Sequence, residues 1–199
     1  MQPVFLDTNV VIDLLARREP FYKEAQLLFT MADRGQLQLQ ISALTFANAS
    51  YALAKHYPVA DAKKYLQQFK VLVSILPLDD KAIELALSSE FLDIEDGFQY
   101  FAALAGGACV IVTRNKKDFK KSALPVLTPT EFLKRWSNST INIFTPTKKA
   151  ARLPALLLFY SMIFLQKSYT TASSLSTSLT PGAFQAKRVA SSFSKRDST

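Results

Sequence analysis

The chain has 199 residues, 49% of them hydrophobic, which is enough for one globular domain with a core of its own. Its formal net charge of +8 suggests an anionic partner, but residues 1–136 carry 16 basic and 15 acidic side chains, whereas residues 137–199 carry eight and one. A near-neutral domain followed by a basic tail is therefore expected. The single cysteine, Cys109, excludes an internal disulfide and is typical of a reducing compartment such as the cytoplasm. The N-terminus has no basic region followed by an apolar run, so we expect no signal peptide.

Short apolar runs alternate with segments of helical periodicity along residues 1–136. The alternation in Leu37–Ile41 predicts a half-buried strand, and the uninterrupted apolar run at Cys109–Thr113 predicts a central strand in which Cys109 is buried. Strands that alternate with helices predict a three-layer α/β/α domain with a central, mostly parallel sheet. In chain order, we predict strands at 4–6, 37–41, 71–76, 109–113 and 125–127, and helices at 9–16, 21–33, 44–56, 61–69, 81–88, 93–104 and 130–136.

Polar residues stand at the start of several predicted helices, where a side-chain oxygen can accept from a free backbone N–H. We expect N-caps at Ser42, at Asp79 or Asp80, at Asp93 and at Thr130. Gly35 is a plausible stop for the helix before it.

Residues 137–199 differ in character from the rest of the chain. They contain 20 Ser and Thr residues, and the apolar segment within them, 153–165, is shorter than a bilayer span. We expect a disordered tail. It could associate with a membrane surface, bind nucleic acid, or be sequence that was never selected to fold with this domain, and we favour the last interpretation.

Five acids are expected to meet at one edge of the sheet. Asp7 directly follows the first predicted strand, Asp93, Glu95 and Asp96 open a later helix, and Asp118 follows the fourth strand. Open α/β sheets place ligand chemistry at the carboxyl ends of their strands. Carboxylates gathered there need a compensating cation, and oxygen ligands suit Mg²⁺ or Mn²⁺, which support phosphodiester hydrolysis.

Three motifs occur in a specific order: VFLDTNV at 4–10, EDGFQY at 95–100 and VIVTRNKKDF at 110–119. The segment ISALT at 41–45 fits with them as a second strand and the helix after it. Together, over residues 3–136, they resemble the PIN-domain family, a metal-dependent ribonuclease fold found in VapC-like toxins of toxin–antitoxin pairs.

The resemblance implies roles for the matching residues. Asp7 and Asp96 would hold Mg²⁺ or Mn²⁺, and Asp118 would complete the catalytic set. Two further positions that are often acidic in the family hold the amides Asn48 and Asn115 here. Supporting roles would fall to Thr8, Asn9, Asp93, Glu95 and Thr113, and contacts with the RNA backbone to Arg114, Lys116 and Lys117.

The implied activity is a metal-dependent endoribonuclease, the toxin of a toxin–antitoxin pair, with an RNA substrate, a small antitoxin partner and a homodimeric assembly, and without a membrane partner. Asn48 and Asn115 favour an alternative, a non-catalytic PIN-like module that holds RNA or a protein without cutting. Nuclease action on DNA is a third, more remote possibility.

Simpler structural roles also exist for these residues. Asp7 could cap the first helix, Asp96 could interact with a helix dipole, and Asp118 could stabilise the turn before Phe119. His56 is expected at the surface or as a capping residue. Core or dimer-interface positions are expected for Phe46, Tyr51, Phe91, Phe98, Tyr100 and Phe101.

Overall fold

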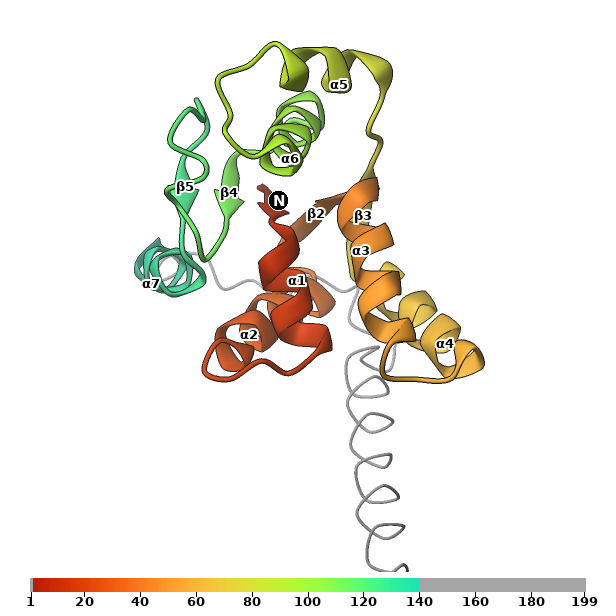
Figure 1. Ribbon diagram of the computed structural model, residues 1–199. Coiled ribbons are helices and arrows are strands. Elements are labelled where there is room, and N and C mark those ends of the chain that lie inside the picture. The colour runs from red at the N-terminus through yellow and green to blue at the C-terminus, as the bar shows by residue number, and fades with distance from the viewer. Residues whose placement is uncertain (1, 140–199) are drawn as a thin grey trace, which may run out of the picture. The chain divides into compact units, whose positions relative to one another are not determined.

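Five parallel strands form one sheet in the part of the chain that the computed structural model describes, residues 2–139 (Figure 1). Their order across the sheet is β3–β2–β1–β4–β5, and every neighbouring pair is parallel. The predicted fold class is confirmed, with a sheet that is wholly rather than mostly parallel. The strands are β1 (Pro3–Leu6), β2 (Gln38–Ser42), β3 (Val73–Leu76), β4 (Val110–Val112) and β5 (Val126–Leu127).

Helices cover both faces of the sheet, because right-handed crossovers in opposite directions place them on opposite sides. The chain moves one way from β1 to β3, so α1 to α4 share a face, and the return to β4 carries α5 and α6 over the other face (Figure 1). The last helix, α7, packs against α2 and so joins the first layer. The helices are α1 (Thr8–Leu15), α2 (Tyr22–Asp33), α3 (Ala43–Ala54), α4 (Val59–Lys70), α5 (Asp80–Leu87), α6 (Ile94–Ala105) and α7 (Pro129–Ser139).

The middle of the sheet is completely enclosed. All three of Val4, Phe5 and Leu6 in β1 are fully buried, as is Ile111 in β4. Phe5 and Ile111 belong to a core cluster with Phe119, which lies in the turn after β4. β1 and β4 therefore give rigid support to the residues that follow their carboxyl ends, Asp7 and Thr113.

Three predicted N-caps are confirmed. Ser42 accepts from the backbone N–H of Thr45 at 3.0 Å, Asp79 accepts from Ala82 at 2.9 Å, and Asp93 accepts from Glu95 at 2.9 Å.

The predicted cap at Thr130 is wrong. The cap of α7 is Thr128, whose hydroxyl accepts from the N–H of Glu131 at 3.2 Å while the Glu131 carboxylate accepts from the N–H of Thr128 at 2.8 Å. This reciprocal capping box moves the helix start to Pro129, a residue well suited to the first helical position.

The prediction of a buried Cys109 is also wrong. Cys109 is exposed and precedes β4, because the strand begins one residue later, at Val110. His56 is exposed, as predicted, and Tyr100 is buried, but Tyr51 is 66% exposed and does not belong to the core. The predicted tail at 137–199, with its apolar segment 153–165, lies almost entirely outside the described residues. None of the helices within residues 2–139 has the length and apolar character needed to cross a bilayer.

Candidate active site

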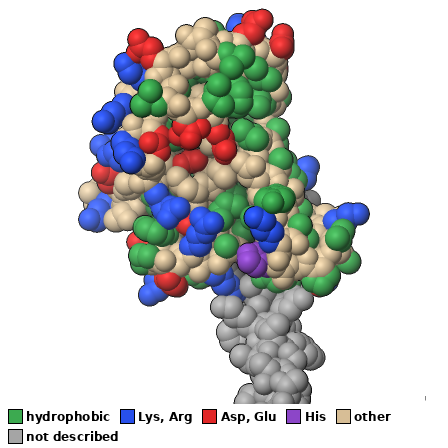
Figure 2. All heavy atoms as spheres, in the orientation of Figure 1, with side chains coloured by type: hydrophobic (Ala, Val, Ile, Leu, Met, Phe, Trp, Pro, Cys, Tyr) green, Lys and Arg blue, Asp and Glu red, His purple; other side chains and the backbone are tan. Residues whose placement is uncertain are grey.

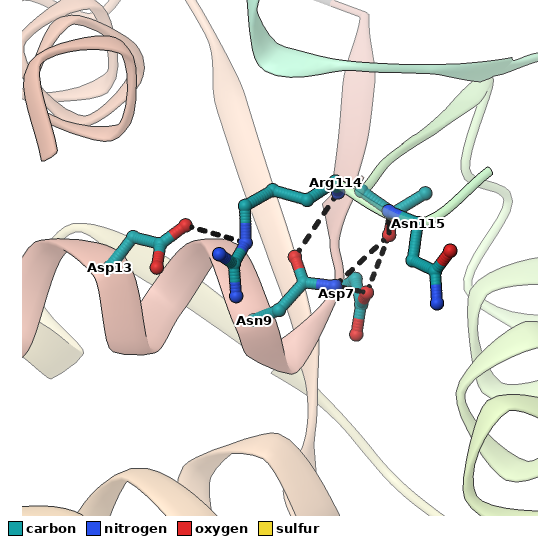
Figure 3. A network of polar contacts seen from close by, with 6 residues as sticks. Asp7, Asn9, Asp13, Arg114 and Asn115 are labelled. Atoms are coloured by element: carbon teal, nitrogen blue, oxygen red, sulfur yellow. Dashed lines mark hydrogen bonds and ion pairs between the residues drawn. The ribbon is translucent and has the colours of Figure 1, made fainter. Parts of the chain in front are cut away.

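Asp7 and Thr113 directly follow the neighbouring strands β1 and β4, so they lie side by side at one edge of the sheet. Leu6 in β1 is paired with Val112 in β4, and the backbone N–H of Asp7 donates to the carbonyl of Val112 at 3.0 Å. Asp7 occupies the N-cap position of α1, but its side chain makes no capping hydrogen bond. The carboxylate instead accepts from Asn9 and from Thr113, as Figure 3 shows for Asn9.

The Asp7 carboxylate is buried in a polar environment. Only 4% of the residue is exposed, and this burial raises its pKa above the ordinary value, an effect that hydrogen bonds from Thr113 and Gln99 oppose. The Thr113 hydroxyl is 2.6 Å from Asp7 Oδ2. The carboxylate of Asp7 is therefore costly to ionise, and its hydrogen bonds fix its orientation.

Asp96 lies in a concentration of negative charge. Burial raises its pKa most, and the charges of Asp7, Asp93, Asp118 and Glu95 raise it further, to about 7. Figure 2 shows acidic side chains gathered at one place on this face of the molecule, with Lys and Arg side chains on the surface around them. The other four acids that the sequence singled out therefore lie near enough to Asp96 for their charges to interact with it, at the edge that the parallel topology predicts.

Glu95 is tied to two of the predicted residues. Its Oε1 accepts from Asn48 Nδ2 at 2.8 Å and from the hydroxyl of Thr8 at 3.4 Å. The amide of Asn48 thus contacts an acid supplied by α6.

Asn115 and Asp118 form the same kind of pair in the loop after β4. The side-chain amide of Asn115 donates to the carboxylate of Asp118, and the backbone N–H of Asn115 donates to Thr113 Oγ1 at 2.9 Å. The loop is thereby linked to Thr113 and, through it, to Asp7.

The three cations predicted to contact RNA differ in their surroundings. Lys117 is exposed. Lys116 makes an exposed ion pair with Glu131 at 3.0 Å. Arg114 is 27% exposed in its side chain and pairs at 3.0 Å with Asp13, a buried acid in α1 (Figure 3).

Sequence reasoning missed two residues near the site, Gln99 and Asp13. Gln99 accepts from the Thr8 backbone N–H at 3.1 Å and from Thr45 Oγ1 at 3.3 Å, and it also contacts Asp7. Its place three residues after Asp96, on the same face of α6, was a usable signal. Asp13 was the other one, since it is an acid inside a run of apolar residues.

A comparison with protein families decides the identity of this fold. A model described as the PIN domain matches residues 3–117, which is more than half of the chain. The chain belongs to the PIN-domain family. The matched region of this PIN domain includes Asp7, Asn48, Asp96 and Asn115 and ends one residue before Asp118.

Several solved structures match the chain, whereas no curated protein does. A toxin–antitoxin complex from Klebsiella pneumoniae is 25% identical, with a TM-score of 0.49 over 63% of this chain and 97% of that chain. DNA-bound VapBC from Salmonella typhimurium is 22% identical, with a TM-score of 0.48 over 65% and 99%. VapBC2 from Rickettsia felis, bound to a promoter DNA fragment, is 19% identical, with a TM-score of 0.48 over 63% and 97%.

The donor set of this PIN domain suits a hard divalent cation. No three His, Cys, Asp or Glu side chains within residues 2–139 are arranged to hold a metal ion by themselves. Mg²⁺ is commonly held by one or two carboxylates together with several waters, so Asp7 and Asp96 are sufficient in number and in chemistry. The raised pKa of Asp96 also indicates a site in which positive charge would be favourable.

Proposed function

We propose that this PIN domain is a metal-dependent endoribonuclease that hydrolyses RNA phosphodiester bonds with Mg²⁺ or Mn²⁺. The observation that carries the proposal is the surroundings of Asp96, whose pKa is raised to about 7 by burial and by the charges of four other acids. Acids that are ionised so close together repel one another, and this repulsion destabilises the folded chain. A divalent cation would remove this cost, which explains why the group is there.

The chain's own residues would then hold and orient the reacting groups. Asp7 and Asp96 would be the protein ligands, and hydrogen bonds from Asn9 and Thr113 would fix the direction of the Asp7 carboxylate. A cation held by Asp7 and Asp96 would supply an acidified water and neutralise charge on the scissile phosphate. Asp118 would act beside them as an acceptor for water, with its carboxylate turned by the amide of Asn115.

Two further acids would support this centre. Glu95 would act through water, with its carboxylate held by Asn48 and Thr8. Asp93, as the cap of α6, would fix the start of the helix that carries Asp96.

Cations near the site would hold the RNA backbone without reading its sequence. Lys117 is exposed and available for a phosphate. The ion pair of Lys116 with Glu131 is exposed, so its net stabilisation is small and a phosphate could replace the carboxylate. Arg114 would contribute the part of its guanidinium that its pair with Asp13 leaves accessible.

A second candidate function is a module that binds RNA or a protein without cutting. Asn48 and Asn115 favour it, because each amide donates to an acid and so occupies oxygen atoms that a cation could otherwise use. Neither amide adds negative charge to the site.

We further propose a cellular role as the toxin of a toxin–antitoxin pair, acting in the cytoplasm as a homodimer and blocked by a small antitoxin. The sequence motifs around Asp7, Asp96 and Thr113 support this assignment through their resemblance to VapC-like toxins.

Cleavage of a mixed RNA pool by the full chain tests the proposal. We expect cleavage with Mn²⁺ or Mg²⁺ that is lost with EDTA and in the Asp7→Asn variant. If the chain neither cleaves RNA nor binds metal by calorimetry, the nuclease proposal is contradicted and the non-catalytic binding module is favoured. Cleavage by Asp7→Asn at the parent rate would refute the assigned site.

A further inference from the structure

Asp13 is a buried acid that the proposed chemistry does not use. Every residue of α1 from Val10 to Leu15 is buried, and only 1% of the Asp13 side chain is exposed. Its Oδ2 pairs with Arg114 Nε at 3.0 Å, whereas its Oδ1 has no hydrogen-bond partner among residues 2–139. Packed apolar side chains in place of both Asp13 and Arg114 would stabilise a fold at least as well, so stability alone does not explain the pair.

The partner of Asp13 is attached to α1 at two points (Figure 3). The backbone N–H of Arg114 donates to Asn9 Oδ1 at 3.2 Å, and its side chain pairs with Asp13. Asn9 and Asp13 are four residues apart and so share one face of the helix. The guanidinium also lies 4.3 Å from the ring centroid of Phe21, which comes just before α2. Both the main chain and the side chain of Arg114 are thus held against α1, the helix that follows Asp7.

Arg114 stands between two residues that contact the acids of the site. Thr113, before it, donates to Asp7, and Asn115, after it, donates to Asp118. Any displacement of Arg114 therefore moves both donors. Small misplacements near a reacting group can lower a rate by large factors.

We propose that Asp13 is a positioning residue of the site, which acts through Arg114 to hold Thr113 and Asn115 in register with Asp7 and Asp118. The catalytic part of this inference rests on the proposed ribonuclease function, but the placement of the loop does not. A buried ion pair gives little net stability compared with apolar packing, and it restricts the arrangements that its two elements can adopt. Changes to residues that orient metal ligands typically lower activity 10- to 100-fold.

A simpler explanation is that Arg114 only neutralises a buried charge. The two explanations differ in what happens when the charge at position 13 is removed. If Arg114 only neutralises Asp13, an uncharged residue at position 13 leaves the loop and the rate unchanged. If Asp13 positions the loop, the same change releases it even when the fold is as stable as before.

The experiment compares the full chain with Asp13→Asn and Asp13→Leu, and uses Glu90→Gln as a matched control. Glu90 pairs with Lys121 a few residues beyond the loop, on an exposed surface, so its loss removes an ion pair without touching the site. Three quantities are measured: the unfolding midpoint, the hydrogen exchange of the Arg114 and Asn115 amides in EDTA, and kcat and KM for RNA cleavage. Asp13→Leu provides a second uncharged variant in case Asp13→Asn folds poorly.

We expect both Asp13 variants to exchange the two amides about tenfold faster or more, with little change in midpoint. We expect kcat to fall about tenfold with a smaller change in KM, and Glu90→Gln to match the parent chain. In an Arg114→Gln background, Asp13→Asn should have almost no further effect, because Asp13 acts through Arg114.

Unchanged exchange at Arg114 and Asn115 in both variants would overturn the proposal, as would a loss of midpoint with an unchanged kcat. Additive effects of Asp13→Asn and Arg114→Gln would also overturn it. A parent chain that does not cleave RNA would contradict the ribonuclease proposal. The positioning role of Asp13 would still be tested, because hydrogen exchange can be measured without catalysis.

Discussion

The hydroxyl of Thr113 lies 2.6 Å from the carboxylate of Asp7 and joins the ends of β4 and β1 by a hydrogen bond between buried side chains. The same oxygen accepts from Asn9 Nδ2 at 3.1 Å and from the backbone N–H of Asn115 at 2.9 Å. One donor and two acceptor positions are all that a hydroxyl offers, so this group is fully used. It connects the first acid of the site to the loop after β4.

Replacement of Thr113 by valine tests this connection. Valine has the same shape but removes one of the two acceptors of Asn9 and the acceptor of the Asn115 N–H, which should cost about 1–3 kcal/mol of unfolding free energy. We expect kcat for RNA cleavage to fall about tenfold as Asp7 loses its orientation. Thr113→Ser keeps the hydroxyl and should retain most of the activity. Equal rates for the valine and serine variants would show that the hydroxyl does not matter.

Asp7→Asn should abolish cleavage without unfolding the domain. The amide oxygen can still accept from Asn9 and Thr113, but it brings no negative charge to a cation. Since burial raises the pKa of Asp7, the charged form is penalised in the folded state, and the neutral variant should be at least as stable in EDTA. Thermal unfolding and cleavage assays on the same preparation check both statements. A marked loss of stability would mean that the carboxylate is structural.

The fold could be predicted because its signals are local. The alternation of strands and helices determined the layers, and the caps at Ser42, Asp79 and Asp93 were legible as single polar residues before apolar turns. The gathering of acids followed from topology, since parallel strands bring their carboxyl ends to one edge. Cys109 was wrongly included in a strand, because an apolar run does not show at which residue a strand begins.

Most hydrogen-bond partners within the site could not be predicted from local sequence patterns. Gln99 and Thr8 are 91 residues apart in the sequence, and their contact depends on how α6 is seated over β1. The pairing of Asp13 with Arg114 depends likewise on strand register and on the path of a loop. The capping box at Thr128 and Glu131 is different, since its spacing is visible in the sequence itself.

The stability of the metal-free chain should fall as pH rises from about 4 to about 7, because the pKa of Asp96 is raised from 3.8 to about 7. Over this window the folded state binds the proton more tightly than the unfolded state does, so stability is greatest at the acidic end and the loss is complete above about pH 7. Burial of Asp7 acts in the same direction.

Thermal unfolding in EDTA at several pH values measures this effect. At pH 8, Asp96→Asn should be more stable than the parent by about 1–2 kcal/mol, after allowance for solvent screening of a partly exposed group. Mn²⁺ should stabilise the parent and not the variant. An unfolding midpoint with the same pH dependence in both chains would contradict the assignment to Asp96.

A chain that ends after Ser139 should cleave RNA as the full chain does, because the match to the PIN domain covers residues 3–117 and the last residue proposed for the site is Asp118. Ending after Trp136 would remove the last three residues of α7 (Pro129–Ser139), the helix that packs against α2. We therefore expect the chain that ends after Ser139 to have a higher unfolding midpoint than the chain that ends after Trp136. A rate for it well below that of the full chain would show that the C-terminal residues take part in function.

Asn48→Asp tests whether the amide at this position belongs to the site. Its Nδ2 donates to Glu95 at 2.8 Å, and a carboxylate there would replace this hydrogen bond by repulsion between two acids. We expect the midpoint in EDTA to fall by an amount equivalent to about 1–2 kcal/mol, and Mn²⁺ to restore more stability than it adds to the parent chain. Asn48→Ala is the control, since it removes the hydrogen bond without adding charge and should show the smaller response to Mn²⁺. Identical responses in the two variants would place Asn48 outside the cation's influence and leave its contact with Glu95 as a purely structural one.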